Sequence, residues 1–279
     1  MIGNAQEEKF EGFKRLHIRQ GIFVIPNPWD AGSARILTAL GYEALATTSA
    51  GLAFSLGRHD MGGGMTRDHV LENARSIVEA THLPVSADLQ NGFGDAPEQC
   101  AATIRLAAKT GLAGGSIEDA TGDPQKPIYE FEHAVDRIAA ASEAAQSLSF
   151  LLTARAENYL SGRLDLDDTI RRLTAFSKAG ADVLYAPGLP DIEAIRVVCS
   201  AVDRPVNVVM GLRGAAFTLD QLREAGVKRV SVGGSFARAA LGALMRAARE
   251  VKEYGTFTYA AEAISHAEAS AFMRSAEKP

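Results

Sequence analysis

The chain has 279 residues, of which 47% are hydrophobic and 23% charged, and its formal net charge is -5. An acidic chain without a basic run is poorly suited to phosphate backbones, so we expect no nucleic-acid partner. No apolar stretch reaches the roughly 18 residues that a membrane span needs, and the opening MIGNAQEEKFEGF holds no signal-like apolar segment, so we expect a cytoplasmic protein without a membrane partner.

Short apolar runs alternate with longer amphipathic patterns along the chain. The expected strands cover residues 22–25, 44–48, 84–88, 115–118, 150–155, 183–186, 206–210 and 230–233. The expected helices cover residues 31–40, 67–80, 97–109, 130–145, 167–178, 192–200, 219–224 and 236–252. Several helices end at a glycine and lead directly into a strand, as in LTALGYEAL and FSKAGADVL. Eight such units, in a chain near the usual length of about 250 residues, predict a (β/α)8 TIM barrel.

Two segments lie outside this repeat. An N-terminal helix over residues 6–17 is expected to cap the barrel with Phe10, Phe13 and Leu16 on one face. A C-terminal helical pattern over residues 259–273 also has an apolar side, which either packs on its own barrel or exchanges with a neighbouring subunit. We treat residues 1–279 as a single barrel domain that includes the C-terminal helical extension 255–279.

The active site of such a barrel lies at the carboxyl ends of its strands. Asp88, Glu118, Asp119 and Arg155 all fall at strand ends and are expected to converge there. Carboxylates held close together repel one another unless a cation lies between them, and Mg²⁺ prefers oxygen ligands. Arginine offers paired donors to a substrate carboxylate. The alternative is that Glu118 or Asp119 forms a structural ion pair without a chemical role.

Glycine-rich segments border the same end of the barrel. The long segment 49–65 follows the second strand and is expected to be a loop that closes over the substrate with His59 or Asp60. Residues 121–127, TGDPQKP, form a second candidate loop on this rim. The glycines in 211–214 and 233–234 instead suit a phosphate cup at a helix N-terminus.

With these residues in view, the chain resembles the isocitrate lyase/phosphoenolpyruvate mutase superfamily over nearly its whole length. The resemblance rests on NPWDAGSARIL, TTSAGLAFSLGRHD, PVSADLQNGFGD, GGSIED, LLTARAEN and PVNVV, in this order. It implies Mg²⁺-dependent chemistry, with Mn²⁺ as a possible substitute, that passes through an enolate-like state beside a carboxylate. It also implies a homo-oligomer, a dimer or a tetramer, in which the C-terminal helix is exchanged between subunits.

The resemblance implies a role for each matching position. Asp88, Gln90 and Glu118 would form the metal site, with Asp60 supporting the ligand shell. Arg155 would grip a substrate carboxylate. The further substrate contacts implied are Trp29, Ser49, Ala50, Gly51, Asp88 and Asn207. The catalytic candidates are Arg155, Asp60, His59 and Glu157, with Lys126 as an additional proton-transfer candidate.

The chain also departs from the family pattern. Gln90 replaces the second acid of the usual Asp-Ala-Asp motif, so metal affinity should be lower. The lyase branch has a cysteine-containing loop after strand four, whereas EDATGDPQKPIYEF has no cysteine. Pro187 takes the place of a glutamate that lyases carry after strand six. The Lys-x-Asn loop of the mutase branch is missing too, so these departures argue against isocitrate, methylisocitrate and phosphonopyruvate.

We therefore expect a Mg²⁺-dependent lyase that cleaves a C–C bond, less favourably a C–P bond, in a small 2-oxo or hydroxy carboxylic acid. Two alternatives remain. One is a non-catalytic barrel that binds a carboxylate metabolite, and the other is a phosphosugar isomerase or synthase that uses the C-terminal glycine turns.

Overall fold

The computed structural model describes residues 2–60, 64–212 and 216–274. Its strands are β1 Phe23–Ile25, β2 Leu45–Ala46, β3 Val85–Asp88, β4 Gly114–Glu118, β5 Leu151–Arg155, β6 Val183–Tyr185, β7 Val206–Val209 and β8 Arg229–Ser231. Its helices are α1 Ile2–Ile18, α2 Ala31–Ala39, α3 Ser49–Ser55, α4 Arg67–Glu79, α5 Pro97–Ala108, α6 Phe131–Gln146, α7 Leu166–Lys178, α8 Ile192–Ala201, α9 Leu219–Glu224, α10 Ser235–Tyr254, the 3₁₀ turn η1 Thr258–Ala261 and α11 His266–Arg274.

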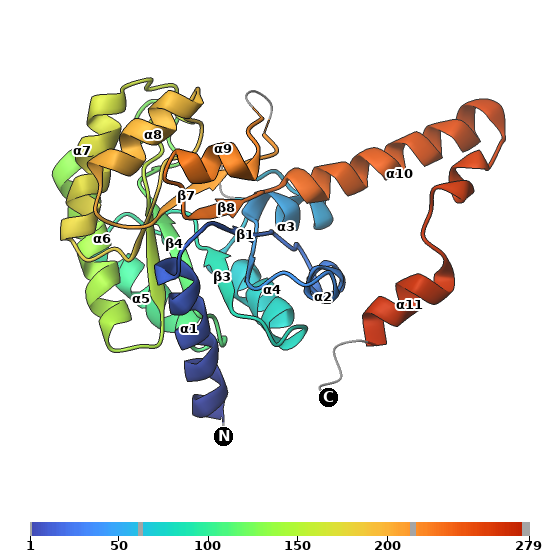
Figure 1. Cartoon of the computed structure of the whole chain (residues 1–279), viewed down its shortest axis with the longest axis horizontal. Coiled ribbons are helices and arrows are strands. Elements are labelled where there is room, and N and C mark those ends of the chain that lie inside the picture. The colour runs from blue at the N-terminus through green and yellow to red at the C-terminus, as the bar shows by residue number, and fades with distance from the viewer. Residues whose placement is uncertain (1, 61–63, 213–215, 275–279) are drawn as a thin grey trace.

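The eight strands are parallel and follow the order β1-β8-β7-β6-β5-β4-β3-β2. β1 and β2 do not form a ladder, but the Ala46 N–H donates to the Pro26 carbonyl at 3.0 Å and so bridges the two strands. Helices surround this nearly closed barrel (Figure 1). The predicted (β/α)8 barrel is therefore confirmed.

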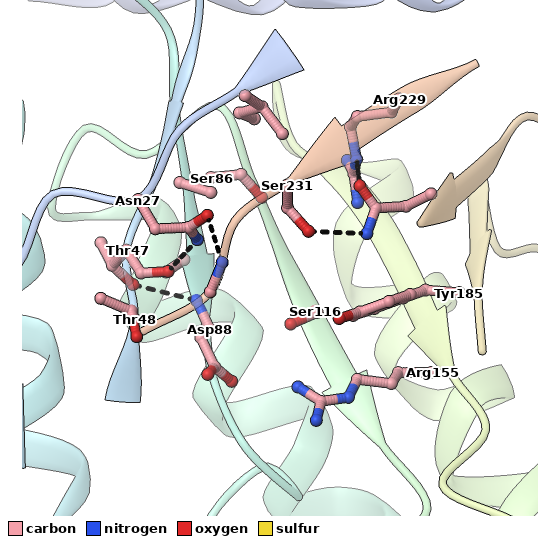
Figure 2. A pocket seen from close by; sticks show the side chains of 15 residues that line it. Asn27, Thr47, Thr48, Ser86, Asp88, Ser116, Arg155, Tyr185, Arg229 and Ser231 are labelled. Carbon is pink, nitrogen blue, oxygen red and sulfur yellow. Dashed lines mark hydrogen bonds between the residues drawn. The ribbon is translucent and has the colours of Figure 1, made fainter. Parts of the chain in front are cut away.

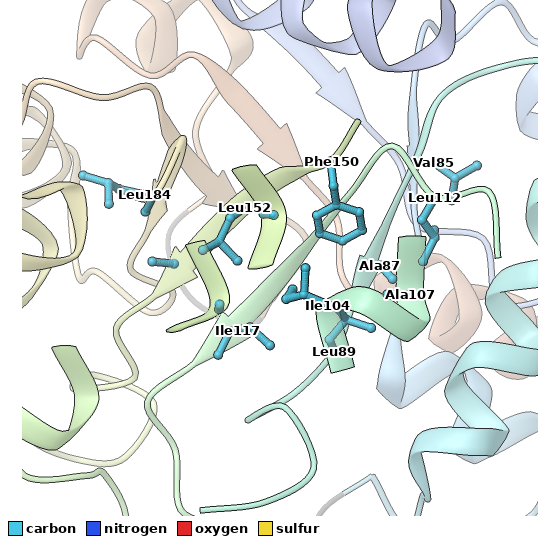
Figure 3. Close-up of a cluster of buried hydrophobic side chains, with 14 of the residues drawn as sticks. Val85, Ala87, Leu89, Ile104, Ala107, Leu112, Ile117, Phe150, Leu152 and Leu184 are labelled. Atoms are coloured by element: carbon cyan, nitrogen blue, oxygen red, sulfur yellow. The ribbon is translucent and has the colours of Figure 1, made fainter. Parts of the chain in front are cut away.

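Apolar side chains fill the space between the strands and the surrounding helices. On one side, Ile104 of α5 packs with Leu89, Ile117 and Phe150 (Figure 3). All four side chains are buried, and burial of this kind supplies most of the free energy that holds helix to sheet. This packing holds β3 and β4, which carry Asp88 and Glu118, against α5.

Helix α1 closes the amino end of the barrel. Phe13 is fully buried and clusters with Leu16, Phe23 and Leu151 near the beginnings of the strands. Gly114 permits this approach, since a Cβ there would lie 3.1 Å from the Phe13 ring and 2.7 Å from the Leu151 carbonyl oxygen. The predicted capping helix is confirmed.

Two predictions about local structure are wrong in part. Residues 49–55 were expected to belong to a loop but form α3, because the Thr48 side chain caps the helix by accepting a hydrogen bond from the Gly51 N–H. The C-terminal pattern is not one helix, because the Ser265 hydroxyl accepts from the Glu268 N–H and begins α11 separately from η1. Residues 61–63 of the expected closing loop lie outside the described residues.

Helix α10 extends away from the barrel, and the chain then returns toward it through α11 (Figure 1). Ala237 is the buried residue of α10, whereas Leu244 and Met245 are at least half exposed. Helix α11 packs on α2, where the Met273 side chain approaches Gly32 and Arg35 donates to the Met273 carbonyl. Within the described ranges, none of the helices has the length and apolar character needed to traverse a bilayer.

Candidate active site

Three charged side chains lie at the carboxyl ends of consecutive strands. Asp88 ends β3, Glu118 ends β4 and Arg155 ends β5. The register aligns Asp88 with Ser116 and Glu118 with Arg155, so the three residues come to one rim of the barrel. Barrel geometry thus brings together residues that are far apart in the sequence.

Arg155 is the central cation of this rim. Its guanidinium lies 3.2 Å from Glu118 Oε2, its Nε–H donates to Glu157, and it stacks 5.1 Å from the Tyr185 ring centroid. Burial alone would lower the pKa of Arg155, but the charges of Glu157 and Glu118 raise it well above its ordinary value. Arg155 is therefore a permanent cation held in place by neighbours on three sides.

The two acids of the rim have different surroundings. Burial raises the pKa of Glu118 well above its usual range; Arg155 opposes this shift and Glu157 reinforces it. Asp88 accepts hydrogen bonds from the Ser49 N–H at 3.3 Å and the Gln90 N–H at 3.2 Å. Among the ion pairs of the described residues, Glu118 has an arginine partner and Asp88 has none. Of these two acids, Asp88 thus contributes the negative charge that no arginine compensates.

Asp60 and Gln90 flank these acids. Burial raises the pKa of Asp60, a hydrogen bond from Ser49 opposes the shift, and the nearby charge of Asp88 adds to it. Among the residues that the structure describes, the buried Asp60 Oδ1 atom has no hydrogen-bond partner. Gln90 adopts a left-handed backbone with φ of 49°, and its carbonyl accepts from the Glu118 N–H at 2.9 Å.

Two cavities meet at Arg155, which lines both. The larger one, of about 1010 Å³, is open at the rim and is lined by Asp60, Gln90, Glu118 and Glu157 among others. The smaller one, of about 70 Å³, extends into the barrel from Asp88 and is also lined by Asn207 (Figure 2). Among the residues described, no three His, Cys, Asp or Glu side chains form a group that could hold a metal ion by themselves.

Several residues singled out from the sequence lie elsewhere. His59 and Lys126 are exposed, and neither is among the residues that line these cavities. Trp29 is also absent from both linings, and its side chain would contact a Cβ at Gly51. Glu157 does reach the larger cavity, but it is paired with Arg155.

The segment Ser49, Ala50 and Gly51 is the first turn of α3 and not a free turn. The Ser49 N–H donates to Asp88 and the Gly51 N–H donates to the Thr48 hydroxyl, so these two amides already have acceptors. A Cβ at Gly234 would lie 3.1 Å from the Ala50 side chain, so that glycine allows α10 to begin close to α3. The other glycine turn, 211–214, lies partly outside the described residues.

Asp119 does not join the rim, contrary to expectation. It is 2% exposed, accepts from Arg172 at 3.0 Å and accepts from the Glu157 N–H at 2.7 Å. Arg172 also donates to Asp168 at 2.8 Å and to the Tyr129 carbonyl at 2.9 Å. The structural ion pair considered as an alternative is thus the one that forms here, and it fixes the backbone beside Arg155.

We expect Arg172→Met to lower the free energy of unfolding by about 3 kcal/mol, because it leaves the Asp119 carboxylate buried without a cation. Urea unfolding measures this change. The matched control is Arg171→Met, which removes an exposed partner of the same Asp168 and should cost less than about 1 kcal/mol. Equal losses in the two variants would contradict a structural role for the buried pair.

Sequence reasoning overlooked two residues of the smaller cavity, Tyr185 and Arg229. Tyr185 ends β6 and lies under the Arg155 guanidinium, where burial raises its pKa to about 12. Arg229 begins β8 and is 5% exposed. Its alternation with Ser231 along the strand was the available signal, because every second residue of a barrel strand faces inward.

Comparison with known proteins agrees with this architecture. A family model described as phosphoenolpyruvate phosphomutase matches residues 13–252. The chain is similar to 2-methylisocitrate lyase of Escherichia coli, with 33% identity over 226 residues that cover 78% of this chain and 75% of that protein. A Burkholderia cenocepacia structure provisionally assigned as a lyase/mutase has 56% identity, a TM-score of 0.94 and 97% coverage of both chains. The structure of 2,3-dimethylmalate lyase, a member of the PEP mutase/isocitrate lyase superfamily, has 25% identity, a TM-score of 0.85 and coverage of 98% of this chain and 95% of that one.

Proposed function

Since the chain belongs to the phosphoenolpyruvate mutase/isocitrate lyase superfamily, we propose that it is a Mg²⁺-dependent lyase that cleaves a C–C bond in a small 2-oxo or hydroxy carboxylic acid. The observation that carries this proposal is the meeting of Asp88, Glu118 and Arg155 at one rim, where Arg155 lines both cavities, Asp88 the smaller one and Glu118 the larger one. Relatives named as 2-methylisocitrate lyase and 2,3-dimethylmalate lyase favour C–C over C–P cleavage.

The donor set of the rim fits Mg²⁺. Its carboxylates and the Gln90 amide offer oxygen ligands, and Asp60 Oδ1 is a buried carboxylate oxygen that has no donor among the described residues, which a metal-bound water would satisfy. Asp88 and Glu118 would hold the ion, largely through water, with Gln90 and Asp60 around it. The ion, for which Mn²⁺ is a substitute, supplies Lewis acidity that polarises a 2-oxo group.

The remaining residues bind and orient the substrate. Arg155 pairs with the substrate carboxylate, and its contacts with Glu157 and Tyr185 fix the direction of its donors. Glu157 is the proton-transfer candidate that lines the larger cavity, whereas His59 and Lys126 are exposed. A carboxylate beside the bound substrate could take or return the proton that accompanies bond cleavage.

The proposal is tested by incubating the protein with Mg²⁺ and oxaloacetate, phosphonopyruvate, isocitrate, methylisocitrate or 2,3-dimethylmalate. We expect cleavage of a C–C bond in at least one of the four carboxylic acids that lack phosphorus. This activity should be lost when a chelator removes the metal. Binding without turnover of any compound would instead support a non-catalytic carboxylate-binding barrel. If none of these compounds binds and a phosphosugar added separately does, the result would support the isomerase alternative.

We expect Gln90→Asp to tighten Mg²⁺ binding by about tenfold, because it adds a carboxylate beside Asp88 and one extra charge contact is worth about 1.4 kcal/mol. The left-handed backbone at position 90 tolerates aspartate better than most residues, so the fold should remain intact. Isothermal titration with Mg²⁺ measures the change. An unaltered dissociation constant would show that side chain 90 does not support the ion.

We also propose that the protein is a homo-oligomer, a dimer or a tetramer, in which the exposed side of α10 packs on a neighbouring subunit. Helix α11 packs on α2 of its own barrel, which is the alternative to subunit exchange considered for the C-terminal pattern. Leu244, Met245 and Phe257 are each at least half exposed along α10 and just beyond it. A row of exposed apolar side chains on one helix is typical of a subunit interface. Sedimentation velocity that gives a monomer at micromolar concentration would contradict this proposal.

A further inference from the structure

An arginine lies inside the barrel below the rim. Arg229 is the first residue of β8 and is aligned with Phe23 of β1 and Asn207 of β7. It is 5% exposed and lines the smaller cavity, near the end of the barrel that α1 closes. Barrel interiors are usually filled by branched apolar side chains, so a cation at this position requires an explanation.

Among the described residues, the hydrogen-bond partners of this guanidinium are all neutral. The Nε–H donates to Asn207 Oδ1 at 2.8 Å, one terminal nitrogen donates to the Thr153 hydroxyl at 3.0 Å, and the other lies 3.4 Å from His17 Nε2. Burial and the charge of Arg229 lower the pKa of His17 to about 3, so that imidazole is uncharged. Burial lowers the pKa of Arg229 to about 10, which still leaves it protonated at neutral pH.

Arg229 therefore differs from the other buried arginines. Arg155 and Arg172 each have carboxylate partners, whereas no carboxylate of the described residues lies within ion-pair distance of Arg229. Arg137 also lacks a carboxylate partner, but it donates to three main-chain carbonyls, covers the Tyr129 ring and is not among the residues lining the two cavities. A buried charge is costly unless a counter-ion compensates it.

The cavity above Arg229 can hold such a counter-ion. Hydroxyl groups of Ser86, Ser116, Ser231 and Tyr185 line it between Arg229 and the rim (Figure 2). Its volume of about 70 Å³ is several times the roughly 15 Å³ that one water requires, so a carboxylate group fits. Serine in place of larger side chains creates this space, and hydroxyl groups can donate hydrogen bonds to an anion.

We propose that Arg229 and the small cavity form a second carboxylate subsite, which takes the distal carboxylate of a dicarboxylic 2-oxo or hydroxy acid. This inference rests on the proposed function, because the other carboxylate of the same molecule pairs with Arg155 at the rim. Arg155 and Arg229 lie toward opposite ends of the cavity, with Ser116 and Tyr185 between them (Figure 2). The substrate would thus span the cavity between two cations.

The test compares two ligands that differ only at the distal end, oxaloacetate and 2-oxobutyrate, in which a methyl group replaces the carboxylate. Affinities are taken from ligand-induced shifts of Tm with Mg²⁺ present. The wild-type protein should prefer oxaloacetate by about 100-fold, the worth of one buried charge pair. Arg229→Gln should abolish this preference and leave the affinity for 2-oxobutyrate within about twofold of the wild-type value, whereas Arg229→Lys should keep part of the preference.

A second variant does not depend on the stability of the Arg229 substitutions. Ser116→Val places an apolar group in the cavity and leaves Arg229 in place, so it should also reduce the preference for oxaloacetate. The control Arg196→Gln removes an exposed arginine of α8 and should leave the preference unchanged.

The outcomes separate the subsite from the proposed function. Wild-type protein that binds both ligands equally, or Arg229→Gln protein that retains the preference, would overturn the subsite alone. Stabilisation by formate together with equal binding of the two acids would mean that the cavity takes a separate small anion, and it would also overturn the distal-carboxylate assignment. Failure of the wild-type protein to bind either acid would overturn the proposed function and the subsite with it.

Discussion

An Arg155→Met variant is expected to lose about 1000-fold in kcat/KM toward its 2-oxo or hydroxy acid, a loss of about 4 kcal/mol. Methionine retains much of the side-chain length but cannot pair with the substrate carboxylate. The substitution also frees Glu118 and Glu157 from their shared cation, so two acids would then repel the incoming anion. Steady-state kinetics with Mg²⁺ at saturation measure the effect, and titration with a 2-oxo acid measures the loss of binding.

Two comparisons separate lost binding from lost structure. The double variant Arg155→Met/Glu157→Gln lacks the negative charge of Glu157, so repulsion of the substrate anion should be weaker than in Arg155→Met. The contact between arginine and the substrate carboxylate remains lost in both variants. Arg163→Met removes an exposed arginine on the segment that follows β5 and should have little effect. Ligand affinity that survives in Arg155→Met protein with an unchanged urea midpoint would disprove the role of this arginine.

The barrel could be predicted because its signals are local and repeat eight times. Each buried strand is a short apolar run, and glycine after several helices marks where the next strand begins. Helix α3 was missed because its seven residues are too few to show a helical period and lead into a glycine-rich segment, and the Thr48 cap that stabilises them is a single side chain. Short elements depend on such individual contacts more than on pattern.

Glu118 and Asp119 show which part of the site could be predicted from the sequence. The two acids are adjacent, and consecutive residues at the end of a strand point to opposite faces of a sheet. Glu118 faces the cavity, whereas Asp119 points outward to Arg172 of α7. Alternation alone predicts that only one of the two acids can reach the rim. It does not predict the buried partner of Asp119, because Arg172 lies in a helix 53 positions further along the chain.

The partners of Arg229 could not be predicted from the sequence, for a different reason. A charged residue at the start of a strand normally indicates an exposed end, and nothing in the local sequence shows that Asn207 and Thr153 lie within hydrogen-bond distance. Only closure of the barrel brings β5, β7 and β8 around one guanidinium. The alternation with Ser231 could thus indicate that Arg229 faces inward, but the lack of a carboxylate partner is recognised only when its neighbours are known.

An Asp88→Asn variant is expected to weaken Mg²⁺ binding by about 100-fold and to lower kcat/KM by about 1000-fold, because metal polarisation contributes several kcal/mol to such reactions. Glu118 and Glu157 share their charge with Arg155, and Gln90 is neutral, whereas Asp88 supplies a negative charge that no arginine of the described residues pairs. Asparagine keeps the size of the side chain but removes that charge.

A matched substitution in the larger cavity gives the control. Asp123→Asn removes an exposed carboxylate that lines the larger cavity. It should leave Mg²⁺ affinity within about twofold, because water screens an exposed charge. Adding Gln90→Asp to Asp88→Asn restores one carboxylate two residues away and should recover part of the affinity. Equal Mg²⁺ dissociation constants for the wild-type and Asp88→Asn proteins would mean that the cation is held elsewhere, and the convergence of strand-end acids would then have no part in metal binding.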